Sequence, residues 1–155
     1  MDEKSTAHIE LENFWPYQVV VLADQISRHT LSVVREQSGL NLSQWRVLAA
    51  VADKPGCSAA QVTTVTPMDK TIVSRAVASL IKTGLIQKSP TKLDKRSHAL
   101  TATRTGLEVY EKISKELIRK LIINNDDIIS HDNFLKLVKS YSSQMIKINE
   151  RDAEL

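Results

Sequence analysis

One predicted helix, residues 66–84, carries side chains that could bind base edges or phosphate groups. At the 3.6-residue helical period, one face collects Thr71, Arg75, Ala78 and Lys82. Ser74 and Ser79 lie on its flanks. Guanidinium, hydroxyl and small methyl groups are the types that contact guanine, phosphate and thymine in DNA. A solvated face of an ordinary amphipathic helix has the same pattern, so the surrounding chain must decide between the two.

The opposite face of this helix is predicted to pack against the core, and residues at its two ends are predicted to start and stop it. Its predicted buried stripe is Val73, Ala76, Val77 and Leu80. The helix begins either with Thr66 as cap and Pro67 in the first turn, or with Asp69 itself as cap. Gly84 is expected to end it, because glycine accepts a left-handed backbone.

The neighbouring segments favour a helix-turn-helix followed by a wing. Ser58 and Gln61 form an S-x-x-Q capping box that opens a short helix just before residues 66–84. After Gly84, two short strands are predicted at 85–89 and 98–103, around a polar, basic tip. A hairpin directly behind such a helix is a wing.

Long helices are predicted on both sides of this lobe. They cover about 13–37, with Asn13 as cap, and then about 104–124 and 130–148, the last capped by Ser130. A further helix after Ser43, its predicted cap, carries Trp45. The long helices carry more apolar surface than a core of about 50 residues can cover, so a symmetric dimer is expected.

Charge is segregated along the 155 residues. Residues 54–104 hold nine Lys/Arg and two Asp/Glu, whereas 1–53 and 105–155 are net negative. A basic segment between acidic ones is typical of a polyanion-binding surface. A membrane surface is disfavoured, because the basic segment lacks a Trp, Phe or Leu face.

Composition and motifs disfavour membrane proteins, secreted proteins and enzymes. No apolar run approaches the roughly 20 residues that span a bilayer, and the acidic start is unlike a secretory signal, so we expect a cytoplasmic protein. The single cysteine, Cys57, excludes an internal disulfide and favours a buried apolar role over a redox switch. With no phosphate loop, nucleophile–base pair or metal-ligand spacing, we expect no enzyme activity, no metal and no cofactor.

Several motifs in this order resemble the MarR family (multiple-antibiotic-resistance-type regulators). They are Leu42-x-Gln44-Trp45-x-Val47-Leu48, the helix-turn-helix, Gly84-Leu85-Ile86, Asp94-Lys95-Arg96 and Ala102-Thr103-x-x-Gly106. Departures occur at Ala102, Thr63 and Thr66-Pro67, which bear on where the recognition helix starts. The resemblance implies a mainly α fold with a β-hairpin wing. Residues 40–104 would form the winged helix-turn-helix lobe, and 1–39 with 105–155 the dimerisation helices, as one structural unit.

The resemblance also implies roles for particular residues. The recognition helix would enter the major groove, and Arg96, fixed by Asp94, would enter the adjacent minor groove, where negative potential is concentrated. The residues expected to contact DNA are Lys70, Thr71, Ser74, Arg75, Ala78, Lys82, Lys92, Asp94, Lys95 and Arg96. Relatives often bind small aromatic or carboxylate ligands near the dimerisation helices. Residues that could line such a pocket here are Trp15, Tyr17, Arg28, His29, Trp45 and Arg46, although aromatic residues at helical spacing are more often core.

The sequence therefore predicts a homodimeric repressor of transcription that binds a pseudo-palindromic DNA operator and is released by a small ligand. An activator or a regulator without a ligand would share these features. A protein-interaction adaptor or an architectural DNA-binding protein is the alternative, and an apolar outer face on the recognition helix would favour the adaptor.

Overall fold

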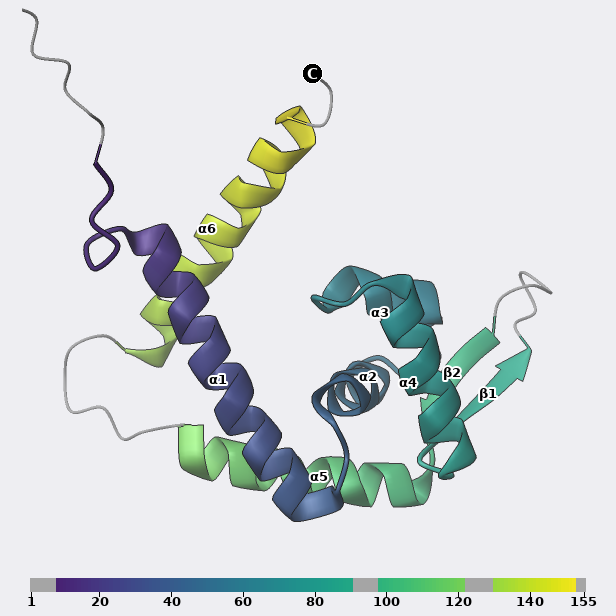
Figure 1. The fold of residues 1–155 in the computed structure, drawn as a ribbon. Coiled ribbons are helices and arrows are strands. Elements are labelled where there is room, and N and C mark those ends of the chain that lie inside the picture. Colours follow the sequence, from purple (N-terminus) through teal and green to yellow (C-terminus); the bar gives the residue numbers. More distant parts are fainter. Residues whose placement is uncertain (1–7, 91–97, 122–129, 153–155) are drawn as a thin grey trace, which may run out of the picture. The chain divides into compact units, whose positions relative to one another are not determined.

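The computed structural model describes residues 8–90, 98–121 and 130–152, which form helices and one β-hairpin (Figure 1). The chain divides into two compact units, Met1–Ile118 and Arg119–Leu155. The elements in chain order are α1 (Trp15–Ser38), α2 (Leu42–Asp53), α3 (Ala59–Val65), α4 (Lys70–Lys82), β1 (Ile86–Pro90), β2 (His98–Ala102), α5 (Arg104–Leu121) and α6 (His131–Asp152). The predicted mainly helical fold with a hairpin wing is confirmed.

The caps of the first two helices differ from the prediction. Phe14, not Asn13, is the N-cap of α1, and a proline follows in the first turn. The Asn13 side chain instead donates a hydrogen bond to Glu10 in the preceding turn, at 2.9 Å. Asn41, not Ser43, caps α2, because the side chain of Gln44 bonds back to the Asn41 amide and closes a reciprocal capping box.

The later caps match the sequence pattern. Ser58 and Gln61 form the predicted box at the start of α3. Asp69 caps α4 by accepting a hydrogen bond from the amide of Ile72 at 2.8 Å. Thr66 is occupied at the end of α3, where its hydroxyl donates to Val62 O. Of the two possible starts of the recognition helix, the one at Asp69 is therefore correct.

The core lies among α2, α3, α4, the hairpin and α5, with the C-terminal part of α1 against it. On α4 it takes Val73, Ala76 and Leu80, as the apolar stripe predicts, with Val77 partly buried. Further buried members are Val34, Leu40, Val47, Leu48, Val51, Cys57, Val62, Met68, Leu85, Ile86, Leu100 and Ile113. The recognition helix is thus held on one side by a continuous apolar core.

The hairpin is anchored at its base. Its antiparallel register runs from Ile86 opposite Ala102 to Pro90 opposite His98. Beside it, Cys57 forms a β-bridge with Leu100, since Leu100 N donates to Cys57 O and Gly56 N donates to Leu100 O, both at 2.8 Å. The bridge ties the hairpin to the α2–α3 connection.

A second joint links the end of α4 to the start of α5. Thr103 donates from its amide to Leu85 O at 3.0 Å and from its hydroxyl to Gly84 O at 2.7 Å. The same hydroxyl accepts the amide of Gly106. A side chain at Gly106 would overlap the backbone of Leu85, so α5 approaches this connection at a distance that only glycine permits.

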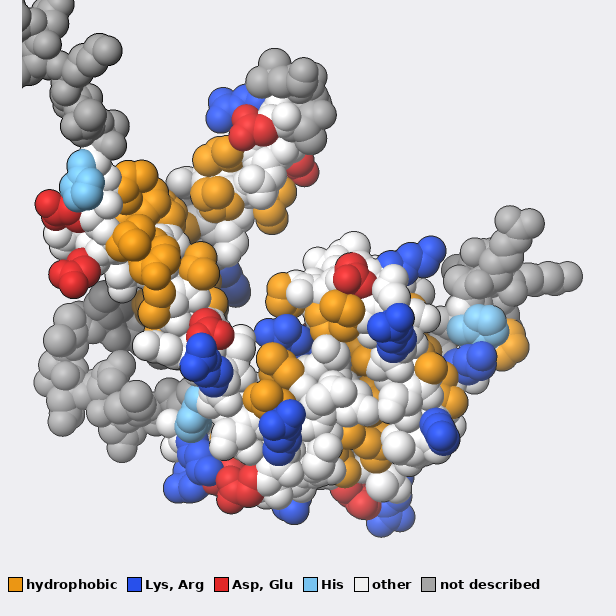
Figure 2. All heavy atoms as spheres, in the orientation of Figure 1, with side chains coloured by type: hydrophobic (Ala, Val, Ile, Leu, Met, Phe, Trp, Pro, Cys, Tyr) orange, Lys and Arg blue, Asp and Glu red, His pale blue; other side chains and the backbone are white. Residues whose placement is uncertain are grey.

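Large apolar side chains remain exposed on the long helices (Figure 2). On the N-terminal half of α1 they are Trp15, Tyr17, Val19, Val20, Leu22 and Ile26. In the second unit, α6 exposes Phe134, Leu135, Leu137, Val138, Tyr141, Met145, Ile146 and Ile148. Within the described ranges, no helix combines the length and apolar character needed to cross a bilayer.

Candidate nucleic-acid interface

The outward face of α4 is built as the sequence predicts. Thr71, Arg75, Ala78 and Lys82 are all exposed, and so are Lys70 and Ser74. The buried stripe on the other side of the helix fixes the direction in which these six side chains point. They present cations, hydroxyls and one methyl group to a partner.

The flank of α4 that faces α2 was not fully predicted. Ser79, placed at the edge of the polar face by the helical period, accepts a hydrogen bond from Gln44 Nε2 at 2.7 Å and is partly buried. Ile72, in the first turn, is 39% exposed, so a long apolar side chain borders the polar face. Ser79 is partly buried and Ile72 is exposed because of where α2 packs against α4. The sequence of α4 alone does not predict that packing.

The cations of α4 are available to a partner. Lys70, Arg75 and Lys82 form no ion pair with any residue that the structure describes. Ion pairs that do form join charges one turn apart on α1 and α5, such as Arg28 with Asp24 and Arg104 with Glu108. The only acid of α4's first turn and cap, Asp69, is held by the amide it caps. The helix therefore presents uncompensated positive charge.

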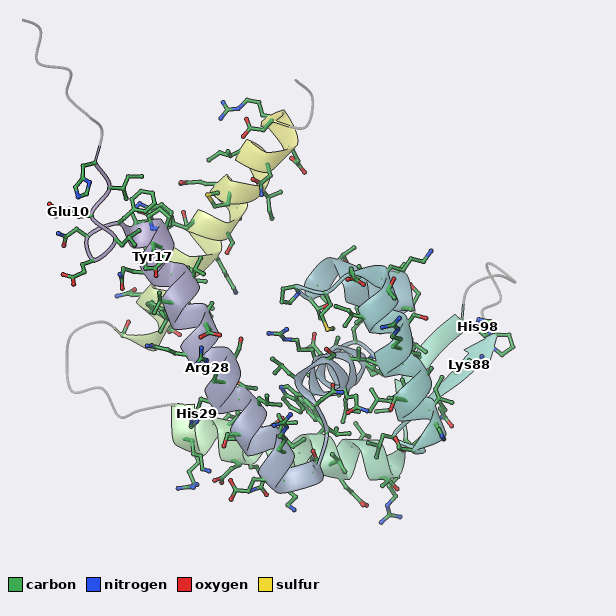
Figure 3. The ribbon with its side chains drawn as sticks, viewed as in Figure 1. Glu10, Tyr17, Arg28, His29, Lys88 and His98 are labelled. Atoms are coloured by element: carbon green, nitrogen blue, oxygen red, sulfur yellow. The ribbon has the colours of Figure 1, made fainter. Side chains whose placement is uncertain are left out.

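A hollow of about 570 Å³ lies between α3, α4 and the hairpin. It is lined by Ser58, Ala59, Ala60, Ser74, Val77, Ala78, Ile81, Lys88, His98 and Leu100. Lys88 and His98 lie near each other on the two strands (Figure 3). His98, the first residue of β2, thus joins a concave surface with Ser74 and Ala78 of the outward face of α4. The predicted wing contacts Lys92, Asp94, Lys95 and Arg96 lie outside the described residues.

The six residues predicted to line a ligand pocket occupy α1 and α2. Tyr17 and Arg28 lie eleven residues apart on α1 (Figure 3), about 16 Å along the axis of a helix. Trp15, like Tyr17, is exposed near the start of α1. Trp45 stacks on Tyr110 of α5, with ring centroids 5.7 Å apart. This stacking places Trp45 against the core.

The other two predicted pocket residues, His29 and Arg46, lie on α1 and α2 respectively. Arg46 donates a hydrogen bond to Ser27 Oγ at 3.4 Å. His29 has a buried Nε2 atom with no hydrogen-bond partner among the residues that the structure describes. A buried polar atom in this state can accept or donate a bond to a molecule that enters beside it.

Cys57 is buried, with 4% of its surface exposed. Burial raises the pKa of its thiol, against smaller opposing effects of its backbone hydrogen bond and of Lys54. A thiol in this state is a poor nucleophile at neutral pH. Among the described residues, no three His, Cys, Asp or Glu side chains are grouped so that they could hold a metal ion.

The lobe that carries this surface matches a known family. Residues 38–97 match the model of the MarR family. This part of the chain is therefore a MarR-family domain. Among curated proteins, it is similar to the HTH-type transcriptional regulator BilQ of Clostridium symbiosum, with 24% identity over 102 residues, covering 66% of this chain and 70% of that one.

Solved structures of MarR regulators share the fold of this chain. A MarR/EmrR regulator from Acinetobacter sp. superposes with a TM-score of 0.75 and 22% identity, covering 92% of this chain and 99% of the other. A mutant of MarR from E. coli, complexed with operator DNA, gives a TM-score of 0.66 and 16% identity, over 88% and 98% of the two chains. The chain thus has the winged-helix fold of these regulators.

Proposed function

We propose that this protein is a homodimer that binds a pseudo-palindromic DNA operator, represses transcription and is released by a small ligand. The outward face of α4 carries this proposal. It presents exposed hydroxyls, together with cations that form no ion pair with a described residue. A hairpin lies beside it in the position of a wing. Such a helix can read base edges in the major groove.

The exposed apolar residues of α1 and of α6 support the dimer. Contiguous apolar surface of this kind is covered in soluble proteins by a partner, and a two-fold axis lets one copy cover another. A dimer would place two recognition helices against two half-sites, about one helical turn or ~34 Å apart. The adaptor alternative is less well supported, because Ile72 alone does not make the outer face of α4 apolar.

The buried, unpartnered Nε2 of His29 supports a ligand site beside α1. We infer that the effector binds there, and the other residues expected to contribute to its site are Trp15, Tyr17, Arg28, Trp45 and Arg46. A ligand that prefers one spacing of the two recognition helices would lower DNA affinity by its difference in affinity for the two states.

Selection of bound sequences from a random duplex pool, at two salt concentrations, tests the proposal. We expect a palindrome with half-sites one turn apart, which then serves as the probe for ligands that release the protein. Recovery of no motif, with binding that vanishes as salt rises, would contradict sequence-specific regulation and favour an architectural role.

A further inference from the structure

The hollow between α3, α4 and the hairpin has the two kinds of surface that a sugar–phosphate strand needs. Its apolar part is formed by Val77, Ile81 and Leu100, and hydroxyls come from Ser58 and Ser74. Lys88 and His98 complete the rim. A deoxyribose has an apolar face, whereas its phosphate accepts hydrogen bonds from ammonium, imidazole and hydroxyl groups.

The register of the hairpin places both basic residues on the same side. Lys88 is opposite Leu100, and His98 is opposite Pro90. Directly opposed residues of antiparallel strands point to one face, and alternate residues along a strand share that face. Lys88 and His98 therefore lie on the face of the hairpin that carries the buried residues Ile86 and Leu100, toward α4.

The hollow lies where the strand between the two DNA grooves would pass. If α4 lies in the major groove and the wing in the next minor groove, the strand that separates the two grooves must pass between them. The hollow lies between α4 and the hairpin, and Ser74 and Ala78 belong both to it and to the outward face of α4. Among the described residues that line it there is no acid that would repel a phosphate.

We infer that one phosphodiester of the operator backbone seats in this hollow, held by Lys88 and His98. The inference rests on the proposed DNA-binding function and adds residues to it. The seat would fix how far the wing lies from the recognition helix on DNA, and so the register of the wing in the minor groove. Phosphate contacts of this kind position a protein without reading sequence.

The test replaces single phosphates of the selected operator by neutral methylphosphonates, one position at a time. We expect one position in each half-site at which the wild-type protein loses affinity roughly tenfold, the size of a lost charged hydrogen bond. In the Lys88→Gln and His98→Ala variants, a methylphosphonate at that same position should no longer lower the affinity. The Lys88→Gln variant should also lower the slope of log K against log salt by about one per contacted phosphate.

Lys115→Gln is the matched control, because it removes the same charge from α5, outside the hollow. It should leave the methylphosphonate pattern unchanged, and Lys88→Arg should keep the wild-type pattern. Thermal unfolding of each variant shows that the fold is intact, as expected for exposed side chains.

Two failures are distinguishable. If the wild-type protein selects no motif, both the proposed function and the seat are wrong. If it binds its operator specifically but Lys88→Gln and His98→Ala keep the wild-type pattern, or silence different phosphates, only the seat is overturned.

Discussion

Gln44 Nε2 donates a hydrogen bond to Ser79 Oγ across 2.7 Å, although 35 residues separate the two in sequence. The other end of the same amide accepts the amide of Asn41 and caps α2. One side chain therefore both starts α2 and holds the recognition helix α4 against it.

We expect Gln44→Ala to lower the free energy of unfolding by about 2 kcal/mol, because it removes a cap interaction and an interhelical bond. Ser79→Ala removes only the interhelical bond and should cost about 1 kcal/mol. The double variant should cost less than the sum of the two, and urea unfolding measures all three. Ser74→Ala, on the outward face of the same helix, is the control. Strict additivity would mean that the bond contributes nothing to stability.

The joint at Gly106 gives a second prediction. Alanine normally favours a helix over glycine by about 1 kcal/mol, but a Cβ here would overlap the Leu85 backbone. We therefore expect Gly106→Ala to destabilise the fold by about 2 kcal/mol or more, since the backbone must shift. Thr105→Ala, exposed in the same turn, should stay near wild type in a thermal melt. A Gly106→Ala protein that melts higher than wild type would show that the approach of α5 is not tight.

Arg75 is expected to read base edges. Arg75→Ala should weaken operator binding by roughly 1–3 kcal/mol and relax base choice at one or two positions. Binding isotherms on the operator and on random duplex separate the two possible roles. Equal losses on both kinds of DNA would reduce Arg75 to a phosphate contact.

The proposed dimer would bury the exposed apolar face of α1. Val19 is 54% exposed, so Val19→Asp should cost the single chain little. In a dimer the new carboxylate would be buried without a partner, and we expect the dimer to weaken by at least about 3 kcal/mol. Sedimentation over a range of concentrations measures this change.

Gln25→Asp is the control, because it adds the same charge to an exposed polar position of α1. It should leave the assembly state as in the wild type. A Val19→Asp protein that assembles like the wild type would exclude this part of α1 from the interface.

Cys57 provides a pH-dependent prediction. Folding raises the pKa of its thiol through burial, so the thiolate favours the unfolded chain. The contribution of Cys57 to stability should be complete at neutral pH and be lost as the pH rises through the pKa of the folded state. The difference in unfolding free energy between wild type and Cys57→Ala, followed from pH 7 upward, measures it. A difference that grows with pH would contradict the direction of the shift.

Sequence reasoning succeeded where the determinant is local. The capping box of Ser58 and Gln61, the buried stripe of α4 and the exposure of Arg75 and Lys82 all follow from spacing within one helix. Asn41 was missed because Ser43 is also a good cap, and only the amide of Gln44 decides between them. Sequence spacing alone also could not predict that Thr66 would be engaged at the end of α3, leaving Asp69 to cap α4.

The unpredicted features of the site are contacts between elements. Ser79 faces Gln44 rather than a partner, and His98 borders a hollow with Ser74, because α2 and the hairpin pack on opposite sides of α4. The requirement for glycine at position 106 arises from the Leu85 backbone, 21 residues earlier. Such relationships need the three-dimensional arrangement, since neither periodicity nor composition encodes them.

The β-bridge between Cys57 and Leu100 fixes the root of the hairpin to the helical lobe, independently of what lies between Pro90 and His98. A hairpin rooted in this way tolerates changes in the length of its connecting segment, because doubling a loop costs only about 0.6 kcal/mol in closure entropy. Insertions and deletions between the strands therefore cost little stability, and related proteins can differ in how far their wings extend. A peptide or reporter tag grafted into the same segment should leave the folded lobe intact, but it would interrupt the residues predicted to contact the minor groove.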